Sequence, residues 1–250
     1  MYYLGLDVGS SSVKAAIVDA KSGKSILSVH EPKNEMGINS LNNDWAEQDP
    51  NMWWKYTCDA IKRVCKESNI DSKKIGSIGI SYQMHGLVVV DKNGSPLRDS
   101  IIWCDSRAVN IGKEAFEKLG QERCMSHLLN SPGNFTASKL KWVKDNEPNI
   151  YEKIYKYMLP GDFIAYKLTG EINTTRNGLS EGIIWDYKNN STADWLLDHY
   201  GIDSNLTPDL VDNFSNQGTT NLKSSNETGL NVGVPITYRA GDQPNNALAL

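Results

Sequence analysis

The first thirty residues place the strongest constraint on the fold, because they predict three consecutive strands joined by short turns. Residues 2–6 are apolar, residues 13–18 are β-branched and alanine-rich, and residues 25–30 alternate between apolar and polar side chains. Strands connected so closely are expected to pair as an antiparallel meander. A helix follows, with Asp49 predicted as its N-cap and Pro50 at its first position.

Further along the chain, helical stretches alternate with short apolar segments. Residues 75–81 predict a strand inside the sheet, and residues 234–240 predict a final strand. The stretch 107–157 is mostly helical and predicts an insertion or a second lobe. Residues 171–230 are polar, with a helix expected near residues 193–200. This order of elements predicts an α/β protein with a mixed sheet and a helical insertion.

The composition excludes several classes of protein. With 39% hydrophobic residues among 250, the chain can bury a substantial core. A net charge of −4 without a basic stripe argues against nucleic-acid binding, and no apolar run reaches the roughly 18 residues of a membrane span. The four cysteines form no CxxC pair, so we expect buried free thiols in a reducing cytoplasm. A cytoplasmic protein, with neither nucleic acid nor membrane as partner, is therefore expected.

The turn after the first strand carries candidate phosphate-binding groups in the run Asp7-Val-Gly-Ser10-Ser11-Ser-Val-Lys14. Glycine permits a sharp turn, and backbone N–H groups and serine hydroxyls there can receive phosphate oxygens. Asp7 is well placed to hold Mg²⁺, directly or through water. The run lacks the spacing of a Walker loop and returns as a strand. On the motif alone, a plain hairpin turn explains it equally well.

The second candidate segment is Gln83-Met84-His85-Gly86, directly after the strand at 75–81. Side chains at the carboxyl ends of parallel strands face the ligand crevice in open α/β sheets. His85 can therefore hydrogen-bond a sugar hydroxyl, with Met84 packing nearby. A single histidine after a strand is more often structural, and both interpretations stay open at this point.

The third candidate is Asp242, at the end of the final strand and before a helix start. A carboxylate there suits a general base that takes the proton from a hydroxyl attacking phosphorus. The alternative is a helix N-cap, which is the commoner use of aspartate in that place. Pro244 fits a helix start in both cases and does not decide between them.

A fourth polar cluster follows a short strand that ends at Trp103. Asp105 and Arg107 lie two residues apart there, and a surface ion pair is the default expectation. Together with Asn134 and Phe135, the cluster can alternatively line a pocket for a polyol.

Taken together, these segments resemble the FGGY carbohydrate kinases, which include glycerol kinase, xylulokinase and gluconokinase, and the motifs follow the order found in xylulokinases. The matching segments are Asp7–Lys14, Trp45–Pro50 with Trp53 and Trp54, Ile80–Gly86, Ile102–Arg107, Phe135–Trp142, Leu159–Phe163, Leu168–Glu171 and Ala240–Asp242. The resemblance covers essentially the whole chain. A set of motifs in a fixed order is far more specific than any one of them.

The resemblance implies the actin/hexokinase-like fold, with ribonuclease-H-like domains, and phosphorylation of a sugar or polyol hydroxyl by ATP with Mg²⁺. Asp242 would be the catalytic base. Asp7 would hold Mg²⁺, while Ser10, Ser11 and Lys14 would face the terminal phosphates. The implied sugar-binding residues are Met84, His85, Trp103, Asp105, Asn134, Asp242 and Gln243.

Two features bear on the sugar. The pair Met84-His85 is that of xylulokinases, whereas glycerol kinases have Arg-Glu there, so a ketopentose such as D-xylulose is favoured. A glutamine directly after Asp242, such as Gln243, is instead typical of glycerol kinases. Ribulose, fuculose, glycerol and related polyols therefore stay open as substrates.

Family members are nearly twice as long as this chain. We therefore expect residues 1–250 to be the N-terminal, sugar-binding domain, with the C-terminal nucleotide-binding domain of the same enzyme as partner. Alone, it is expected to bind sugar weakly but transfer no phosphate. The alternatives are a non-catalytic sugar-binding module, disfavoured by the presence of both Asp7 and Asp242, and an actin-like ATPase, disfavoured by Met84-His85. The sequence leaves open whether the chain forms a homodimer.

Overall fold

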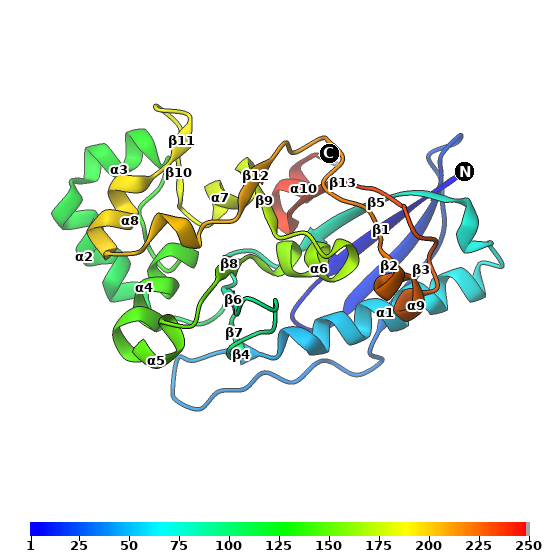
Figure 1. Ribbon diagram of the computed structural model, residues 1–250, viewed down its shortest axis with the longest axis horizontal. Coiled ribbons are helices and arrows are strands. Elements are labelled where there is room, and N and C mark those ends of the chain that lie inside the picture. Colours follow the sequence, from blue (N-terminus) through cyan, green and yellow to red (C-terminus); the bar gives the residue numbers. More distant parts are fainter. Residues whose placement is uncertain (249–250) are drawn as a thin grey trace.

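A five-stranded mixed sheet forms the centre of one lobe in the computed structural model, which describes residues 1–248 (Figure 1). Its strand order is β13-β5-β1-β2-β3, with β1, β2 and β3 antiparallel and β1, β5 and β13 parallel. The bounds are β1 Tyr2–Val8, β2 Val13–Asp19, β3 Ser25–Glu31, β5 Ile75–Tyr82 and β13 Ile236–Gly241. The predicted meander, inner strand and final strand are all confirmed.

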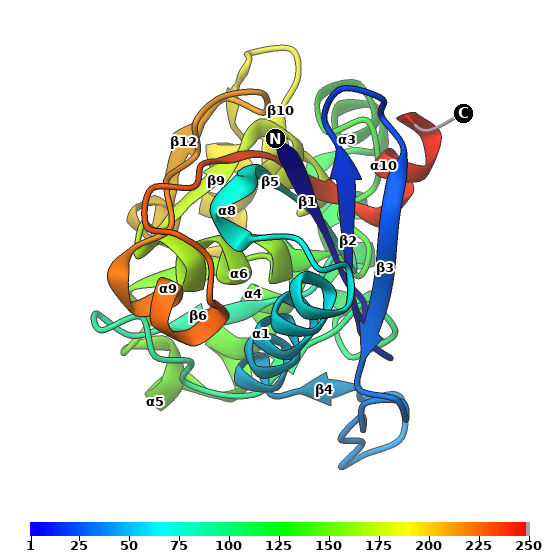
Figure 2. The ribbon, with the colours of Figure 1, turned by 90° about the vertical axis from the view of Figure 1, so that its right-hand side faces the viewer.

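Helices cover one face of this sheet. Helix α1 (Pro50–Glu67) packs along β2 and β3 and also contacts α6 (Pro160–Thr169) and α9 (Leu222–Thr228) (Figure 2). The Asp49 carboxylate accepts the N–H of Asn51, as predicted for the N-cap. Trp53 and Ile61 of α1 are fully buried in the core, because the apolar residues of the helix recur every three to four positions.

The second lobe is mainly helical and has a hydrophobic core of its own, which confirms the predicted insertion (Figure 1). Its helices are α2 Val109–Leu119, α3 Gln121–His127, α4 Thr136–Asn146, α5 Pro148–Tyr151, α7 Arg176–Glu181 and α8 Asp194–Tyr200. The short ladders pair β4 Glu47–Gln48 with β7 Ser100–Ile101, β6 Val88–Val90 with β8 Lys156–Met158, β9 Asn173–Thr175 with β12 Asp209–Val211, and β10 Trp185–Asp186 with β11 Ser191–Thr192. Two 3₁₀ turns, η1 Ser72–Lys74 and η2 Ser204–Leu206, and helix α10 Asp242–Leu248 complete the elements.

The polar stretch 171–230 contains the expected helix as α8, and it also forms α7, α9 and two short ladders that its composition did not indicate. Residues 173–175 of one ladder are buried. One expectation needs correction. The cysteines are all free thiols, but Cys104 is exposed and Cys65 is only half-buried. Their burial depends on contacts distant in the sequence, which spacing alone does not reveal.

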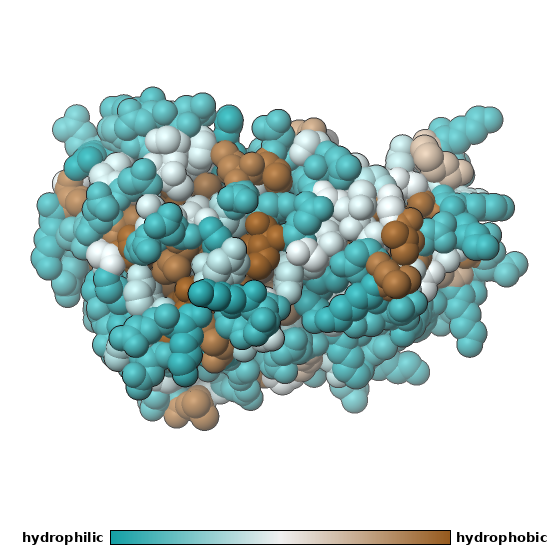
Figure 3. Space-filling model, in the orientation of Figure 1, coloured by the Kyte–Doolittle hydropathy of each residue, from teal (hydrophilic) through white to brown (hydrophobic). Residues whose placement is uncertain are grey.

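The face of the molecule seen in Figure 3 is mostly hydrophilic, with apolar residues gathered in small separate patches. Most large apolar side chains lie in the two cores instead. Within residues 1–248, no helix combines the length and the apolar character that crossing a bilayer requires.

Candidate active site

Three of the predicted segments meet at one edge of the central sheet. The register pairs Asp7 with Ser81, and Ser81 with Ala240, across the parallel strands β1, β5 and β13. Parallel strands end at the same edge, so the hairpin after β1, the turn after β5 and Asp242 after β13 lie there together. The fold thus brings three segments that are far apart in the sequence to the same edge of the sheet.

Gly241 brings the turn after β5 against the end of β13. A Cβ built on Gly241 would lie 2.3 Å from Cγ of Met84 and 2.6 Å from Oε2 of Glu181. Only glycine, which lacks this atom, allows both side chains to approach so closely. Met84 and Glu181 are therefore immediate neighbours of the residue that precedes Asp242.

We expect Gly241→Ala to lower the free energy of unfolding by about 1–3 kcal/mol, because the methyl group overlaps two packed side chains. The matched control is Gly79→Ala on β5, where nothing lies within 4 Å of an added Cβ. Urea denaturation of both variants measures the difference. Equal stability of the two variants would contradict the close approach at Gly241.

Asp242 is half-buried and opens α10. Asn245 fastens this corner, because its Nδ2 donates to the backbone oxygens of Ala240 and Gly241, each at 2.9 Å. Within residues 1–248, the Asp242 carboxylate makes no hydrogen bond or ion pair, and both oxygens can accept one. Gln243 is exposed on the first turn of the same helix.

The imidazole of His85 is held in one orientation. Its Nδ1 lies 3.0 Å from the backbone oxygen of Glu181, and its ring meets Phe135 edge to face at 4.5 Å. A carbonyl oxygen only accepts, so we assign the proton to Nδ1 and leave Nε2 as an acceptor. Burial lowers the pKa of His85 to about 4, and the positive charge of Lys139 acts in the same direction. The ring is therefore neutral near pH 7.

A cavity of about 330 Å³ lies beside this turn. Its lining includes Met84 and His85 among the predicted residues, and Pro244 next to Gln243. Sequence reasoning missed the other polar residues of the lining, which are Asn130, Asn177, Ser180, Glu181 and Tyr187. The one available signal was Glu181, an acid within the otherwise apolar and small run 178–185.

Glu181 is nearly completely buried behind the cavity. Burial raises its pKa well above the usual range, and the charges of Asp162 and Asp242 add to this, while the backbone N–H of His85 opposes it. Burial therefore favours the neutral form of this carboxyl group over the charged one.

The expectation of a surface ion pair between Asp105 and Arg107 is wrong, because both side chains are buried. Asp105 accepts from Arg107 Nη2 at 2.7 Å and from the backbone N–H of Ala46 at 2.7 Å. Arg107 stacks over the ring of Trp45 at 3.8 Å and pairs with Glu47 at 2.6 Å. Asp105 and Arg107 therefore connect their loop to residues 45–47, about sixty positions earlier in the sequence.

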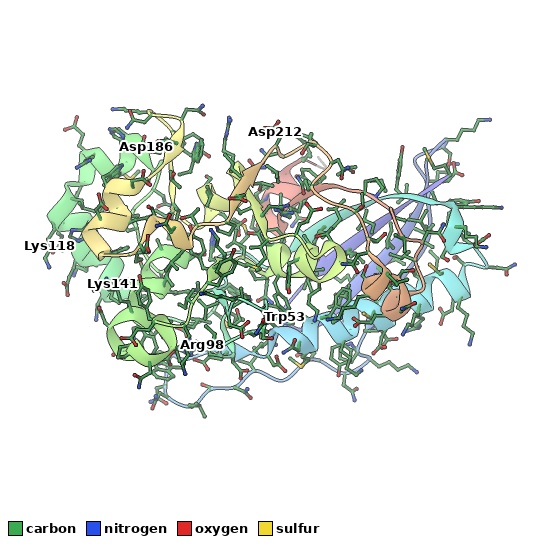
Figure 4. All side chains as sticks on the ribbon, viewed as in Figure 1. Trp53, Arg98, Lys118, Lys141, Asp186 and Asp212 are labelled. Carbon is green, nitrogen blue, oxygen red and sulfur yellow. The ribbon has the colours of Figure 1, made fainter. Side chains whose placement is uncertain are left out.

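This network reaches the lobe boundary through Arg98, which pairs with Glu47 and with Glu147 (Figure 4). Asn134 belongs to it as well, since its Nδ2 donates to the backbone oxygen of Asp105. The Oδ1 of Asn134 is buried and has no partner within residues 1–248. Asp105 and Asn134 thus brace one another, and neither lines the cavity beside His85.

The hairpin after β1 is held from behind by a buried glutamine. Gln48 Nε2 donates to the backbone oxygen of Ser10 at 2.7 Å, and its Oε1 accepts the indole N–H of Trp53 at 3.0 Å. Trp103 is 54% exposed and donates its indole N–H to Ser10 Oγ at 3.2 Å. Trp103 therefore lies on the hairpin side of the site, while Ser11 is exposed at the tip.

Asp7 faces Lys14 across the hairpin, with its carboxylate 3.0 Å from Nζ, and both groups are accessible to solvent. Among residues 1–248, no group of three or more acidic, histidine or cysteine side chains gathers into a metal cage. A single exposed carboxylate fits Mg²⁺, which keeps several waters and takes its other ligands from phosphate. The hairpin thus places a carboxylate, a cation and hydroxyl groups close together.

The sequence was compared with known proteins. Residues 2–249 match the FGGY family of carbohydrate kinases, N-terminal domain. A xylulose kinase of Staphylococcus xylosus is 31% identical over 98% of this chain and 49% of its own length, and a glycerol kinase of Thermococcus onnurineus is 29% identical over 97% and 48%. The chain thus spans about half the length of the curated relatives it matches.

The fold agrees with this match. The solved structure of a xylulose kinase from Rhodospirillum rubrum superposes with a TM-score of 0.92 over 100% of this chain and 50% of its own, at 24% identity. The mixed sheet with its helices is accordingly the α/β architecture of the actin/hexokinase-like ATPases. The chain belongs to the FGGY family of carbohydrate kinases.

Proposed function

We propose that this chain supplies the sugar site and the catalytic base of a kinase that phosphorylates a pentulose, with D-xylulose as the favoured substrate and D-xylulose 5-phosphate as product. The observation that carries the proposal is the meeting of the hairpin, Met84-His85 and Asp242 at one sheet edge. A sugar hydroxyl bound there can reach a base, and the hairpin can hold the phosphate that the hydroxyl attacks.

In this proposal, Asp242 takes the proton of the attacking sugar hydroxyl. The oxygen of that hydroxyl bonds to the γ-phosphorus of ATP, and the bond from this phosphorus to ADP breaks. The free lone pairs of the Asp242 carboxylate support this role. Ser10, Ser11 and Lys14 hold the terminal phosphates. Asp7 would hold Mg²⁺, which when bound neutralises charge on the phosphate oxygens.

The choice of sugar rests on the groups around the cavity. His85 offers a fixed acceptor at Nε2, so it selects a ligand whose hydroxyl donates a hydrogen bond at that point. Met84 supplies an apolar wall beside it. Both residues are those of xylulokinases. Gln243 and the similarity to a glycerol kinase keep a smaller polyol as the second candidate.

The nucleotide needs a further partner. We propose that a second domain, of the kind that makes up the remaining half of the relatives, binds the adenosine of ATP. Residues 1–250 alone would then bind sugar without turning over. The proposed sugar site also includes Trp103, Asp105 and Asn134. The last two act through the loop that they stabilise.

The test is a coupled assay of ADP release by the protein that joins this chain to the proposed second domain, with MgATP and a panel of D-xylulose, D-ribulose, L-fuculose and glycerol. We expect kcat/KM for D-xylulose to exceed the others by at least about 10-fold. A preference for glycerol would overturn the assigned substrate but leave the kinase. Absence of any sugar-dependent ADP release would overturn the kinase itself.

A further inference from the structure

Two buried ionisable side chains that the proposed mechanism does not use hold opposite ends of one residue, His85. The Nζ of Lys139 donates to the backbone oxygen of His85 at 2.8 Å. On the other side, Oε1 of Glu181 accepts the backbone N–H of His85 at 3.4 Å. The second contact is long and the first is short, so Lys139 makes the stronger attachment.

Lys139 is unusual because its side chain has no exposed surface, yet it forms no ion pair within residues 1–248. Its ammonium instead donates to two backbone oxygens, those of His85 at 2.8 Å and Ile102 at 2.9 Å. Burying a lysine charge costs free energy that two carbonyl bonds only partly recover. Such an arrangement indicates a specific task at this place.

The segments that carry the two backbone oxygens indicate what Lys139 does. His85 ends the turn that lines the cavity, and Ile102 immediately precedes the loop of Trp103 and Asp105. These segments follow two different strands, β5 and β7. One ammonium group therefore binds two of the segments that carry sugar-binding residues of the proposed site.

The backbone of His85 needs such support. Its φ is +62°, in the left-handed region that residues other than glycine adopt at a cost of about 1–3 kcal/mol. This conformation aims the ring at Phe135 and the cavity. Without an external hold on its carbonyl group, the turn can relax and move the imidazole away.

We propose that Lys139 is a positioning residue for the sugar site: its ammonium fixes the strained His85 turn and the Trp103 loop in the geometry that receives the substrate. The ammonium needs its proton for this, because only the charged form makes strong bonds to both oxygens. The sugar readout below rests on the proposed function, whereas the readout on His85 does not.

The first arm compares Lys139→Met with Lys141→Met in the full chain. Methionine keeps the length of the side chain and removes its donors. Lys141 lies two residues along the same helix and, within residues 1–248, pairs only with Asp145 on the surface of the helical lobe (Figure 4). The measurements are the Kd for D-xylulose by calorimetry and the imidazole ¹⁵N signals of His85 by long-range ¹H–¹⁵N NMR.

Loss of charge-assisted bonds predicts that Lys139→Met raises this Kd roughly 10- to 100-fold. The His85 signals should move from the fixed Nδ1–H tautomer toward an average of both tautomers. Lys141→Met should leave Kd within about twofold, as exposed pairs contribute little. Unchanged Kd and unchanged His85 signals in a folded Lys139→Met protein would overturn the proposal.

A second arm needs no variant. Burial lowers the pKa of Lys139 to about 8, Arg107 acts in the same direction, and Asp105 and Cys104 oppose it. The ammonium is thus lost as pH rises through about 8, and the wild-type Kd should rise over the same range. Of the other groups around the ammonium, Asp105 and Arg107 form an ion pair with each other, His85 is already neutral, and burial raises the pKa of the Cys104 thiol above its ordinary value.

As pH rises, the stability of the fold should increase while the affinity for the sugar falls. Between pH 8 and about 10.5 the unfolded lysine binds more protons than the folded one, so the contribution of Lys139 to the free energy of unfolding rises with pH. A weaker affinity in a protein that is not destabilised separates positioning from general unfolding. A wild-type Kd that stays flat from pH 7 to 9.5 would overturn the proposal even if Lys139→Met fails to fold.

These experiments distinguish a failure of the proposed function from a failure of the proposed role of Lys139. If the wild-type chain binds none of the sugars, the proposed substrate class fails, and the His85 signals still decide on Lys139. If sugar binds and neither the variant nor alkaline pH weakens it, the role of Lys139 fails and the sugar site stands.

Discussion

Asp242→Asn is expected to lower kcat of the two-domain protein by about 10³-fold, because an amide cannot accept the proton of the attacking hydroxyl. The shape and size of the side chain are almost unchanged. Sugar binding should therefore change little, and the loss should fall on kcat rather than KM. Coupled ADP release at saturating D-xylulose and MgATP gives kcat, and calorimetry gives the sugar Kd.

The matched control is Asp212→Asn, an exposed aspartate in the segment before β13 (Figure 4). Its carboxylate makes no hydrogen bond within residues 1–248, as that of Asp242 makes none. Wild-type turnover is expected for this control. Retention of more than a tenth of the activity by Asp242→Asn would contradict its role as base.

Arg239→Met is expected to cost about 3–5 kcal/mol in the free energy of unfolding, the second large effect. Arg239 is fully buried in β13 and donates to Asp162 Oδ1 at 2.8 Å and to Asn173 Oδ1 at 2.7 Å. These bonds connect β13, the strand that precedes Asp242, to α6 and β9. Removing the guanidinium leaves the Asp162 carboxylate buried without its cation.

Urea denaturation monitored by tryptophan fluorescence measures this loss. Arg63→Met is the control, because Arg63 pairs with Glu31 and Glu67 near the surface, and such pairs contribute about 1 kcal/mol or less. The pKa of Asp162 is already raised by burial, and loss of Arg239 raises it further. Protonation of Asp162 therefore relieves part of the destabilisation, so the deficit should shrink as pH falls below 7. A deficit below about 1 kcal/mol at pH 7 would contradict the structural role of this pair.

Local chemistry made much of the fold predictable. The meander of β1, β2 and β3 follows from short turns between apolar runs, and α1 begins where Asp49 can cap it and Pro50 fits its first turn. Strand β5 was predicted inside the sheet from its short, mainly apolar run, and it lies between β1 and β13. These signals lie within a few residues of the elements that they determine.

The sequence by itself determined the five strands of the central sheet, α1 and the polar turns that follow β1, β5 and β13, because turn formation, capping and strand patterning act over short distances. Only the tertiary structure decided that Asp105 and Arg107 are buried, since Ala46, Trp45 and Glu47 cover them from another part of the chain. The same holds for Lys139 and Glu181, whose task depends on meeting His85 across 54 and 96 residues. Burial and partnership are properties of what packs opposite a side chain, and a single sequence carries no direct signal for that.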